Sequence, residues 1–164
     1  MAAHLLRPAG RCHCGAIQLD LELSRAPDEL RLRACQCGFC RPRGVRTIAD
    51  PDGRAIVRAD RPEALNRYRF GLRLADYLLC AACGTYVAAV QPDDPLIAVV
   101  NVGGLGVPEF EGRTADPVSY ADETPEDRLA RRRSYWMPIE IAYSAAGAGA
   151  SSSSSCGVDQ SSSP

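Results

Sequence analysis

Apolar and polar residues alternate strictly along residues 16–24, AIQLDLELS, so that the isoleucine and the three leucines share one face. A period of two residues predicts a half-buried strand. The alternation recurs at 30–35, LRLRAC, and shorter strand candidates follow at 45–49, 55–58, 65–70, 72–79, 85–90 and 96–102. Strands at intervals of about ten residues favour antiparallel sheets over alternating strand and helix units. The expected fold class is therefore mostly β, with antiparallel sheets.

One segment, TPEDRLARRRSYW at 124–136, carries the signals of a helix. Thr124 suits the N-cap, Pro125 suits the first helical position, and Asp127 lies in the first turn. We expect about ten helical residues and one short C-terminal helix. The arginines at 131–133 complement the helix dipole near its end, and a patch for a partner or nucleic acid is the alternative.

The chain is expected to form one zinc-binding domain over residues 10–143, preceded by an N-terminal extension at 1–9. From residue 144 the sequence is SAAGAGASSSSSCGVDQSSSP, which has almost nothing large enough to bury. Such a tract predicts a disordered tail over 144–164. Cys156 in this tail has no ligand partner nearby, which favours an incidental thiol over a regulatory one.

Charge and hydropathy narrow the function classes. All 19 basic residues are arginine, and the 20 acidic residues bring the net charge to −1. A chain so balanced is not, as a whole, a binder of polyanions. No apolar run approaches the roughly 18 residues of a membrane span, and the start lacks the longer apolar region of a signal peptide. We therefore expect a cytoplasmic protein without a membrane partner.

Cysteine spacing is the strongest chemical signal. Seven of the eight cysteines fall in tight groups, and a reducing compartment favours metal binding over disulfides. Cys12-x-Cys14 and Cys80-x-x-Cys83 together supply the four thiolates of a closed structural zinc site. Such a site would tie the beginning of the domain to its later strands, so that binding energy becomes folding energy.

The remaining group, Cys35, Cys37 and Cys40 in CQCGFC, offers three thiolates. Three protein ligands leave an open position for water or substrate, which is typical of catalytic zinc. Two zinc ions per chain are expected. The alternatives are that His13 or a distant aspartate closes this second site, or that the three cysteines form a redox or metal-storage site.

Five motifs in order carry a family resemblance over residues 10–112: GRCHCGAI, CQCGFCRPRG, YRFG, CAACGT and VVNVGGL. They resemble the glutathione-dependent formaldehyde-activating enzyme family, which includes the centromere protein V domain. The resemblance implies a β-tent fold, a structural zinc on the first four cysteines and a second zinc on the other three. It also implies a carbon-sulfur lyase activity, the formation of S-(hydroxymethyl)glutathione from glutathione and formaldehyde. Gly38, where the family often has serine, is one departure from its pattern, and LLC before Cys80 is another.

These considerations suggest a small-molecule thiol and an aldehyde as partners. The backbone amides around Gly38 and Phe39 are candidates for orienting the substrate. Arg41, Arg43 and Arg46 are candidates for binding its carboxylates, or are solvated surface residues. The runner-up function is a non-catalytic zinc module that binds a protein or nucleic acid through the arginines at 41–46 and 128–133.

Overall fold

The computed structural model describes residues 7–144, and the predicted tail beyond them, with Cys156, lies outside the described residues. The strands are β1 (Ala9–Arg11), β2 (Ile17–Glu22), β3 (Arg33–Cys35), β4 (Arg54–Ala59), β5 (Leu65–Tyr68), β6 (Asp76–Cys80), β7 (Tyr86–Gln91), β8 (Ile97–Val100), β9 (Asp116–Val118) and β10 (Met137–Tyr143). The helix is α1 (Pro125–Tyr135), and short 3₁₀ helices form at Pro27–Glu29, Arg41–Arg43, Pro62–Ala64 and Pro108–Phe110. Of the residues described, none belongs to a helix long and apolar enough to cross a membrane. The predicted mostly β fold with one short C-terminal helix is confirmed.

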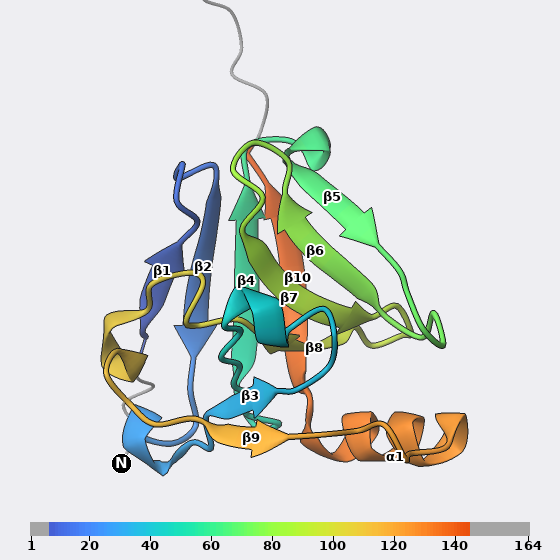
Figure 1. Ribbon diagram of the computed structural model, residues 1–164. Helices are drawn as coiled ribbons and strands as arrows, with labels where there is room; N and C mark the ends of the chain where they lie inside the picture. The colour runs from blue at the N-terminus through green and yellow to red at the C-terminus, as the bar shows by residue number, and fades with distance from the viewer. Residues whose placement is uncertain (1–6, 145–164) are drawn as a thin grey trace, which may run out of the picture.

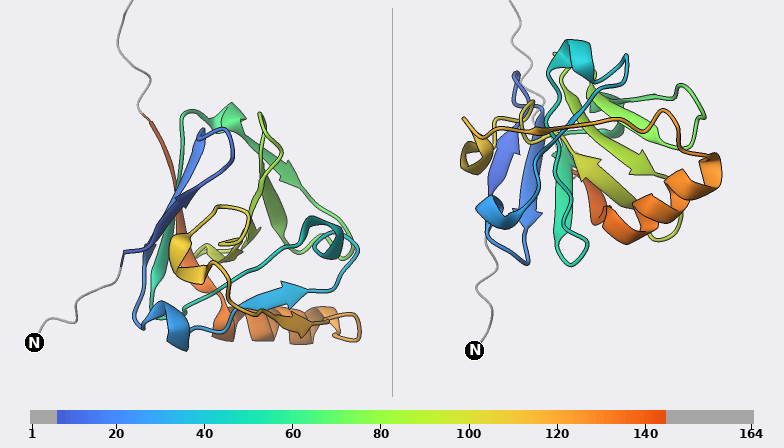
Figure 2. Two further views of the ribbon diagram at one scale, coloured as in Figure 1. Left: turned by 60° about the vertical axis from the view of Figure 1, so that its left-hand side comes forward. Right: turned by 60° about the horizontal axis from the view of Figure 1, so that its bottom comes forward.

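The main sheet has eight strands in the order β1-β2-β4-β10-β8-β7-β6-β5. Its two halves diverge on either side of β10, and α1 and the small β3-β9 sheet lie across the open end between them (Figures 1 and 2). Most neighbours are antiparallel, as predicted, but β4-β10 and β3-β9 are parallel. These two pairs join segments far apart in the chain, so no hairpin turn dictates their direction.

The alternation at 16–24 has the predicted result. Ile17, Leu19 and Leu21 of β2 are fully buried, while Gln18 between them is exposed. Their face joins one core cluster that reaches across both halves of the sheet to Leu78 and Met137. Burying such side chains contributes about 1.5–3 kcal/mol each.

Two strand predictions need correction. Residues 45–49 form only isolated bridges, Thr47 with Arg33 and Ile48 with Val100, because this segment crosses between two sheets. The strand expected at 72–79 starts at Asp76, since positive φ angles at Gly71 and Arg73 make a turn first. Three further strands were not predicted: β10, which lies in the middle of the main sheet, and the short strands β1 and β9.

Helix α1 begins as predicted. The Thr124 side chain accepts a hydrogen bond from the backbone N–H of Asp127 at 3.1 Å, and Pro125 occupies the first turn. The helix continues for 11 residues and ends at Tyr135, where β10 follows after Trp136. Its predicted capping chemistry is therefore confirmed.

Asp76 on β6 is the buried carboxylate of a small ion-pair group. It accepts hydrogen bonds from Arg69 Nε and, at 3.2 Å, from Arg67 Nη1. The Arg69 hydrogen bond outweighs burial and lowers the Asp76 pKa. A carboxyl whose pKa is lower in the folded chain stabilises the fold above its unfolded pKa of about 4, and this contribution is lost as pH falls through the folded value.

Asp76→Asn is therefore expected to reduce the free energy of unfolding at pH 7 by about 1–2 kcal/mol, since both arginines are partly exposed. The difference from wild type should shrink as pH falls below about 4. Urea unfolding at pH 7 and pH 3 measures both effects. Asp20→Asn, at an exposed pair with Arg58, is the matched control and should change stability by less than about 0.5 kcal/mol. An undiminished Asp76→Asn difference at pH 3 would contradict this account.

Candidate metal sites and the adjoining cavity

The first cysteine group joins the two halves of the main sheet. Cys12 and Cys14 lie in the β1-β2 connection, Cys80 ends β6, and Cys83 lies in the following turn. The Sγ atoms of Cys12 and Cys14 are 3.6 Å apart, as are those of Cys14 and Cys80, and all four lie within 4.8 Å of one another. Tetrahedral zinc with bonds of about 2.3 Å requires sulfurs about 3.8 Å apart, so the group fits such an ion.

Local backbone structure positions these four thiols. A turn follows each cysteine pair before the next strand begins. These turns contain Gly15 and Gly84, whose φ angles of 82° and 74° lie in a region that favours glycine. The Ile17 N–H donates to Cys12 Sγ at 3.3 Å, and Cys83 Sγ lies 3.2 Å from the Thr85 hydroxyl. Backbone and side-chain donors of this kind stabilise metal-bound thiolates.

The pKa values within this group diverge. The Thr85 hydrogen bond lowers the pKa of Cys83 to about 5, whereas burial raises the pKa of Cys80 to about 12 and also raises that of Cys12. Buried thiols of raised pKa become thiolates when a divalent cation balances the charge. The donor set therefore suits a metal ion rather than four free thiols.

The second group consists of Cys35 at the end of β3, Cys37, and Cys40 just before the 3₁₀ helix at Arg41–Arg43. Their Sγ atoms also lie within 4.8 Å of one another, and the Cys40 N–H donates to Cys37 Sγ at 3.4 Å. The hydrogen bond with Cys40 lowers the pKa of Cys35 to about 6, and the same bond raises that of Cys40. This set of donors can also hold a metal ion.

Within residues 7–144 no histidine, carboxylate or further cysteine joins this triplet. His13, the fourth ligand in the alternative interpretation, belongs to neither group. The folded chain therefore groups the cysteines into four and three, as their spacing predicted.

A cavity of about 760 Å³ adjoins the cysteine triplet. Aromatic and aliphatic side chains of the second core cluster form part of its wall, and arginines from β3, the segment just before it and α1 form another part. The lining comprises Arg31, Arg33, Cys35, Gln36, Cys37, Cys40, Thr47, Phe70, Tyr77, Tyr86, Ala89, Val99, Val118, Ser119, Tyr120, Ala121, Arg128, Arg131, Arg132, Tyr135 and Trp136. The four cysteines of the first group do not line it.

The aromatic wall is tightly packed. The Phe39 ring lies 5.2 Å from Phe70, 5.0 Å from Tyr77 and 5.2 Å from Tyr86, which places it directly behind the cavity-lining rings. Burial is the main cause that raises the pKa of Tyr77 to about 12 and that of Tyr86 well above its usual value. Both phenols keep their protons at neutral pH, as tyrosines of ordinary pKa also do, and both residues line the cavity.

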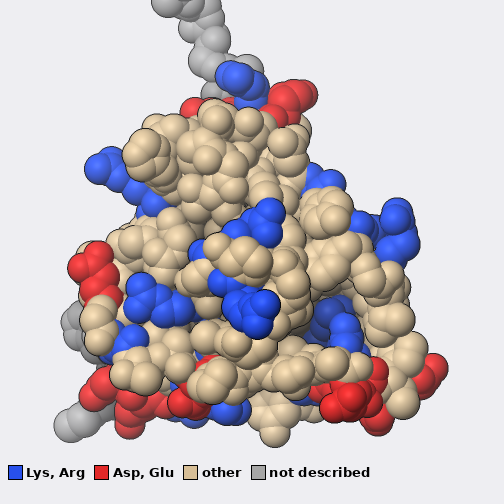
Figure 3. All heavy atoms as spheres, in the orientation of Figure 1, with Lys and Arg blue, Asp and Glu red and all other residues tan. Residues whose placement is uncertain are grey.

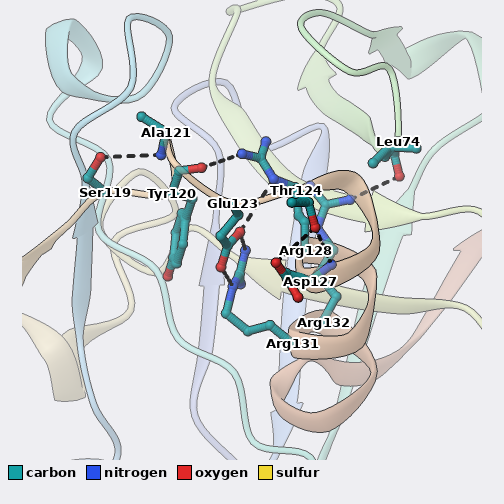
Figure 4. Close-up of polar contacts among 10 residues, drawn as sticks. All are labelled: Leu74, Ser119, Tyr120, Ala121, Glu123, Thr124, Asp127, Arg128, Arg131 and Arg132. Atoms are coloured by element: carbon teal, nitrogen blue, oxygen red, sulfur yellow. Dashed lines mark hydrogen bonds and ion pairs between the residues drawn. The ribbon is translucent and has the colours of Figure 1, made fainter.

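Helix α1 and the segment before it form the arginine wall (Figure 4). Glu123 accepts hydrogen bonds from Arg131 Nε at 2.5 Å and Nη2 at 2.9 Å, and its carboxylate lies 3.4 Å from Arg128 Nε. Arg128 also donates to the Tyr120 carbonyl, and Arg132 donates to the Leu74 carbonyl at 3.0 Å. The arginine run thus has contacts beyond the helix dipole, which the sequence alone did not indicate.

The substrate-binding candidates from the sequence lie elsewhere. Gly38, Phe39 and Arg43 line a second, more open pocket beside Cys80, and the Arg43 guanidinium lies 4.1 Å from the centre of the Phe39 ring. Arg41 is exposed, and Arg46 packs beside Gly103. Since none of these five residues lines the larger cavity, their role in substrate binding stays a prediction.

On the face shown in Figure 3, arginines lie in several groups, and acidic side chains gather along the lower edge and at the top. This mixed pattern agrees with the net charge of −1. A nucleic-acid surface requires a concentration of positive charge on one face or along one groove. The face in view does not have this distribution.

No protein-family model matches the chain. A crystal structure of a Rhodobacter sphaeroides protein, a structural genomics target, is 34% identical to it. The match covers 67% of this chain and 99% of that one, with a TM-score of 0.49.

Proposed function

We propose that this protein is a zinc-dependent carbon-sulfur lyase that acts on a thiol-aldehyde adduct, as S-(hydroxymethyl)glutathione synthase does. The observation that carries the proposal is the position of Cys35, Cys37 and Cys40 at the wall of the cavity. The group of four cysteines has a full set of structural ligands, whereas this triplet has three ligands and an adjoining space for a small molecule.

In the proposed reaction one carbon-sulfur bond forms and the thiol proton passes to the aldehyde oxygen, so no oxidant or reductant is needed. A zinc ion on the triplet would supply a Lewis acid with an open position for sulfur or oxygen. The chain's own contribution is to hold the two reactants together and to exclude water. The rings of Phe70, Tyr77 and Tyr86 serve the second role, and the two phenols can donate to a developing oxyanion.

The family resemblance supports this proposal through the same cysteines, because its motifs include every member of both groups. The alternative, a zinc module that binds a protein or nucleic acid, would use the arginines at 41–46 and 128–133. Arg128 and Arg131 are instead paired with Glu123, and both line the cavity. This arrangement favours a small-molecule ligand.

The test is exchange NMR on formaldehyde and glutathione at equilibrium, with catalytic amounts of zinc-loaded protein. Wild type is expected to speed interconversion, and Cys37→Ala should return it to the uncatalysed rate while retaining the fold. Arg58→Ala, in an exposed pair with Asp20, is the control and should behave as wild type. Equal rates with wild type and without protein would reject the activity for this pair of substrates.

A further inference from the structure

The arginines that line the cavity are not all paired. Arg31 contacts Asp116 at 2.7 Å, and Arg128 and Arg131 share Glu123. Arg33 and Arg132 are the other two. Among residues 7–144, no carboxylate lies within ion-pair distance of either. The cavity therefore has two guanidinium charges without a counterion from the described chain.

Arg132 is the more unusual of the two, because it is only 5% exposed. One of its terminal nitrogens donates to the Leu74 carbonyl, and its guanidinium lies 4.5 Å from the centre of the Trp136 ring. Its Nε is buried without a hydrogen-bond partner. A buried N–H of a charged group without a partner is costly, and an anion beside the guanidinium would offset part of this cost through its charge.

Arg33 projects from β3, the strand that ends at Cys35 of the triplet. It is partly buried, and burial is the main cause that lowers the pKa of both Arg33 and Arg132. An anionic partner would favour the charged form of each. An anion would thus stabilise both guanidinium groups, and both residues line the cavity beside the cysteine triplet.

We propose that Arg33 and Arg132 make this cavity a subsite for carboxylate groups of the organic substrate, and so determine its specificity. This proposal rests on the proposed function, since it concerns the substrate that binds in the same cavity. The substrates would be thiols that carry a carboxylate, together with the aldehyde adducts of these thiols. Guanidinium groups match a carboxylate in geometry as well as charge. The ligand is organic because the remaining wall includes Phe70, Tyr77 and Trp136, and the volume exceeds that needed for a small inorganic anion.

Trp136 gives a direct readout of binding, because it is the single tryptophan in the chain and contacts Arg132. The zinc-loaded full chain is titrated with glutarate, which has two carboxylates and no thiol, while tryptophan fluorescence is recorded. Glutarate is expected to change the emission in a saturable way, and its neutral diamide is not. Inorganic phosphate should bind at least tenfold more weakly than glutarate.

Arg33→Gln and Arg132→Gln are each expected to weaken glutarate binding at least tenfold, because each removes charged hydrogen bonds. Arg31→Gln is the matched control, a cavity arginine already paired with Asp116, and should change the affinity less than threefold. If Arg132→Gln does not fold, Arg33→Gln carries the test. An unchanged affinity in Arg33→Gln, a silent glutarate titration, or phosphate binding as tightly as glutarate would overturn the subsite.

Different results would reject the lyase activity and the carboxylate subsite. Saturable glutarate binding that depends on Arg33, without catalysed exchange of glutathione and formaldehyde, would support the subsite and reject the lyase activity. Catalysed exchange that is as fast with 2-mercaptoethanol as with 3-mercaptopropionate would support the lyase activity and reject the carboxylate subsite.

Discussion

Cys80→Ala is expected to lose the cooperative fold, or to lower the free energy of unfolding by about 4 kcal/mol or more. The reason is the position of this thiol at the end of β6, in contact with Cys14 of the β1-β2 connection. In the order of the main sheet, β1 and β2 lie at one end, and β6 and β5 lie at the other. A metal ion on these cysteines would thus tie together two ends that the sheet's own hydrogen bonds do not join.

The expected size follows from the chemistry of structural zinc. Such sites bind with apparent free energies of about 10–16 kcal/mol, comparable with the whole stability of a typical domain. Loss of one of four thiolates also leaves Cys12, which is 1% exposed, without the cation that would stabilise its charged form. Circular dichroism during thermal unfolding, with zinc analysis of the purified protein, measures both the fold and the metal.

Cys37→Ala is the matched control for Cys80→Ala, since it removes one thiol from the other group. Its group lies on β3 and the loop that follows, within nine residues of chain that include the adjoining 3₁₀ helix at Arg41–Arg43. The variant should contain one zinc instead of two and unfold near the wild-type temperature. A Cys80→Ala protein that keeps two zinc ions and the wild-type midpoint would show that the first group is not structural.

Local patterns predicted the parts of this structure that depend on nearby residues. The strand at β2 follows from the alternation of its apolar residues, and the start of α1 follows from Thr124 and Pro125. Cysteine spacing predicted both metal groups, although their members come together from positions up to 71 residues apart, Cys12 and Cys83. Short spacing within a pair already indicates that its two cysteines share an ion. Only the combination of Cys12 and Cys14 with Cys80 and Cys83 therefore depended on the fold.

The central strand β10 was missed although MPIEIAY alternates, with Met137 and Ile139 buried. A proline within such a run counts against a strand inside a sheet, because proline lacks the N–H that a ladder needs. In the structure Pro138 lies where β10 meets β8 over only two residue pairs, and the longer ladder with β4 begins at Ile139. The proline is thus tolerated at the end of the main ladder.

Closeness to the triplet along the chain does not decide which arginines line the cavity beside it. Arg41, Arg43 and Arg46 follow the triplet directly, but the chain turns through the 3₁₀ helix at Arg41–Arg43 and leaves the cavity wall. Arg31 and Arg33 do line the cavity, and the alternation of LRLRAC places both on the same face as Cys35. That signal could have found them. The contribution of α1 could not be predicted, because it depends on residues about 90 positions apart, such as Arg128 and Cys35, lining the same cavity.

Asn101→Asp is expected to cause the second largest loss of folding stability after Cys80→Ala. It keeps the shape of the side chain but replaces a buried hydrogen-bond donor, the amide NH₂, with an oxygen. Asn101 is 4% exposed, its Nδ2 donates to the Tyr86 carbonyl at 2.9 Å, and its Oδ1 accepts from the N–H groups of Arg46 and Gly104 at 3.2 Å. One side chain thus joins the start of β7 to two loops. Tyr86 itself lines the cavity, so this contact also supports the wall of the site.

The aspartate would keep both accepted bonds but would place a carboxylate oxygen against the Tyr86 carbonyl in a buried site. We expect a loss of about 3–4 kcal/mol at pH 7, from the lost donor and the burial of a charge. Acidic solution should restore part of it, since a protonated carboxyl regains one donor. Urea unfolding at pH 7 and pH 4.5 provides the measurement, and Asn66→Asp on exposed β5 is the matched control. If Asn101→Asp matched this control at pH 7, the Tyr86 contact would be dispensable, and the wall beside the cysteine triplet would have to be held by its ring packing alone.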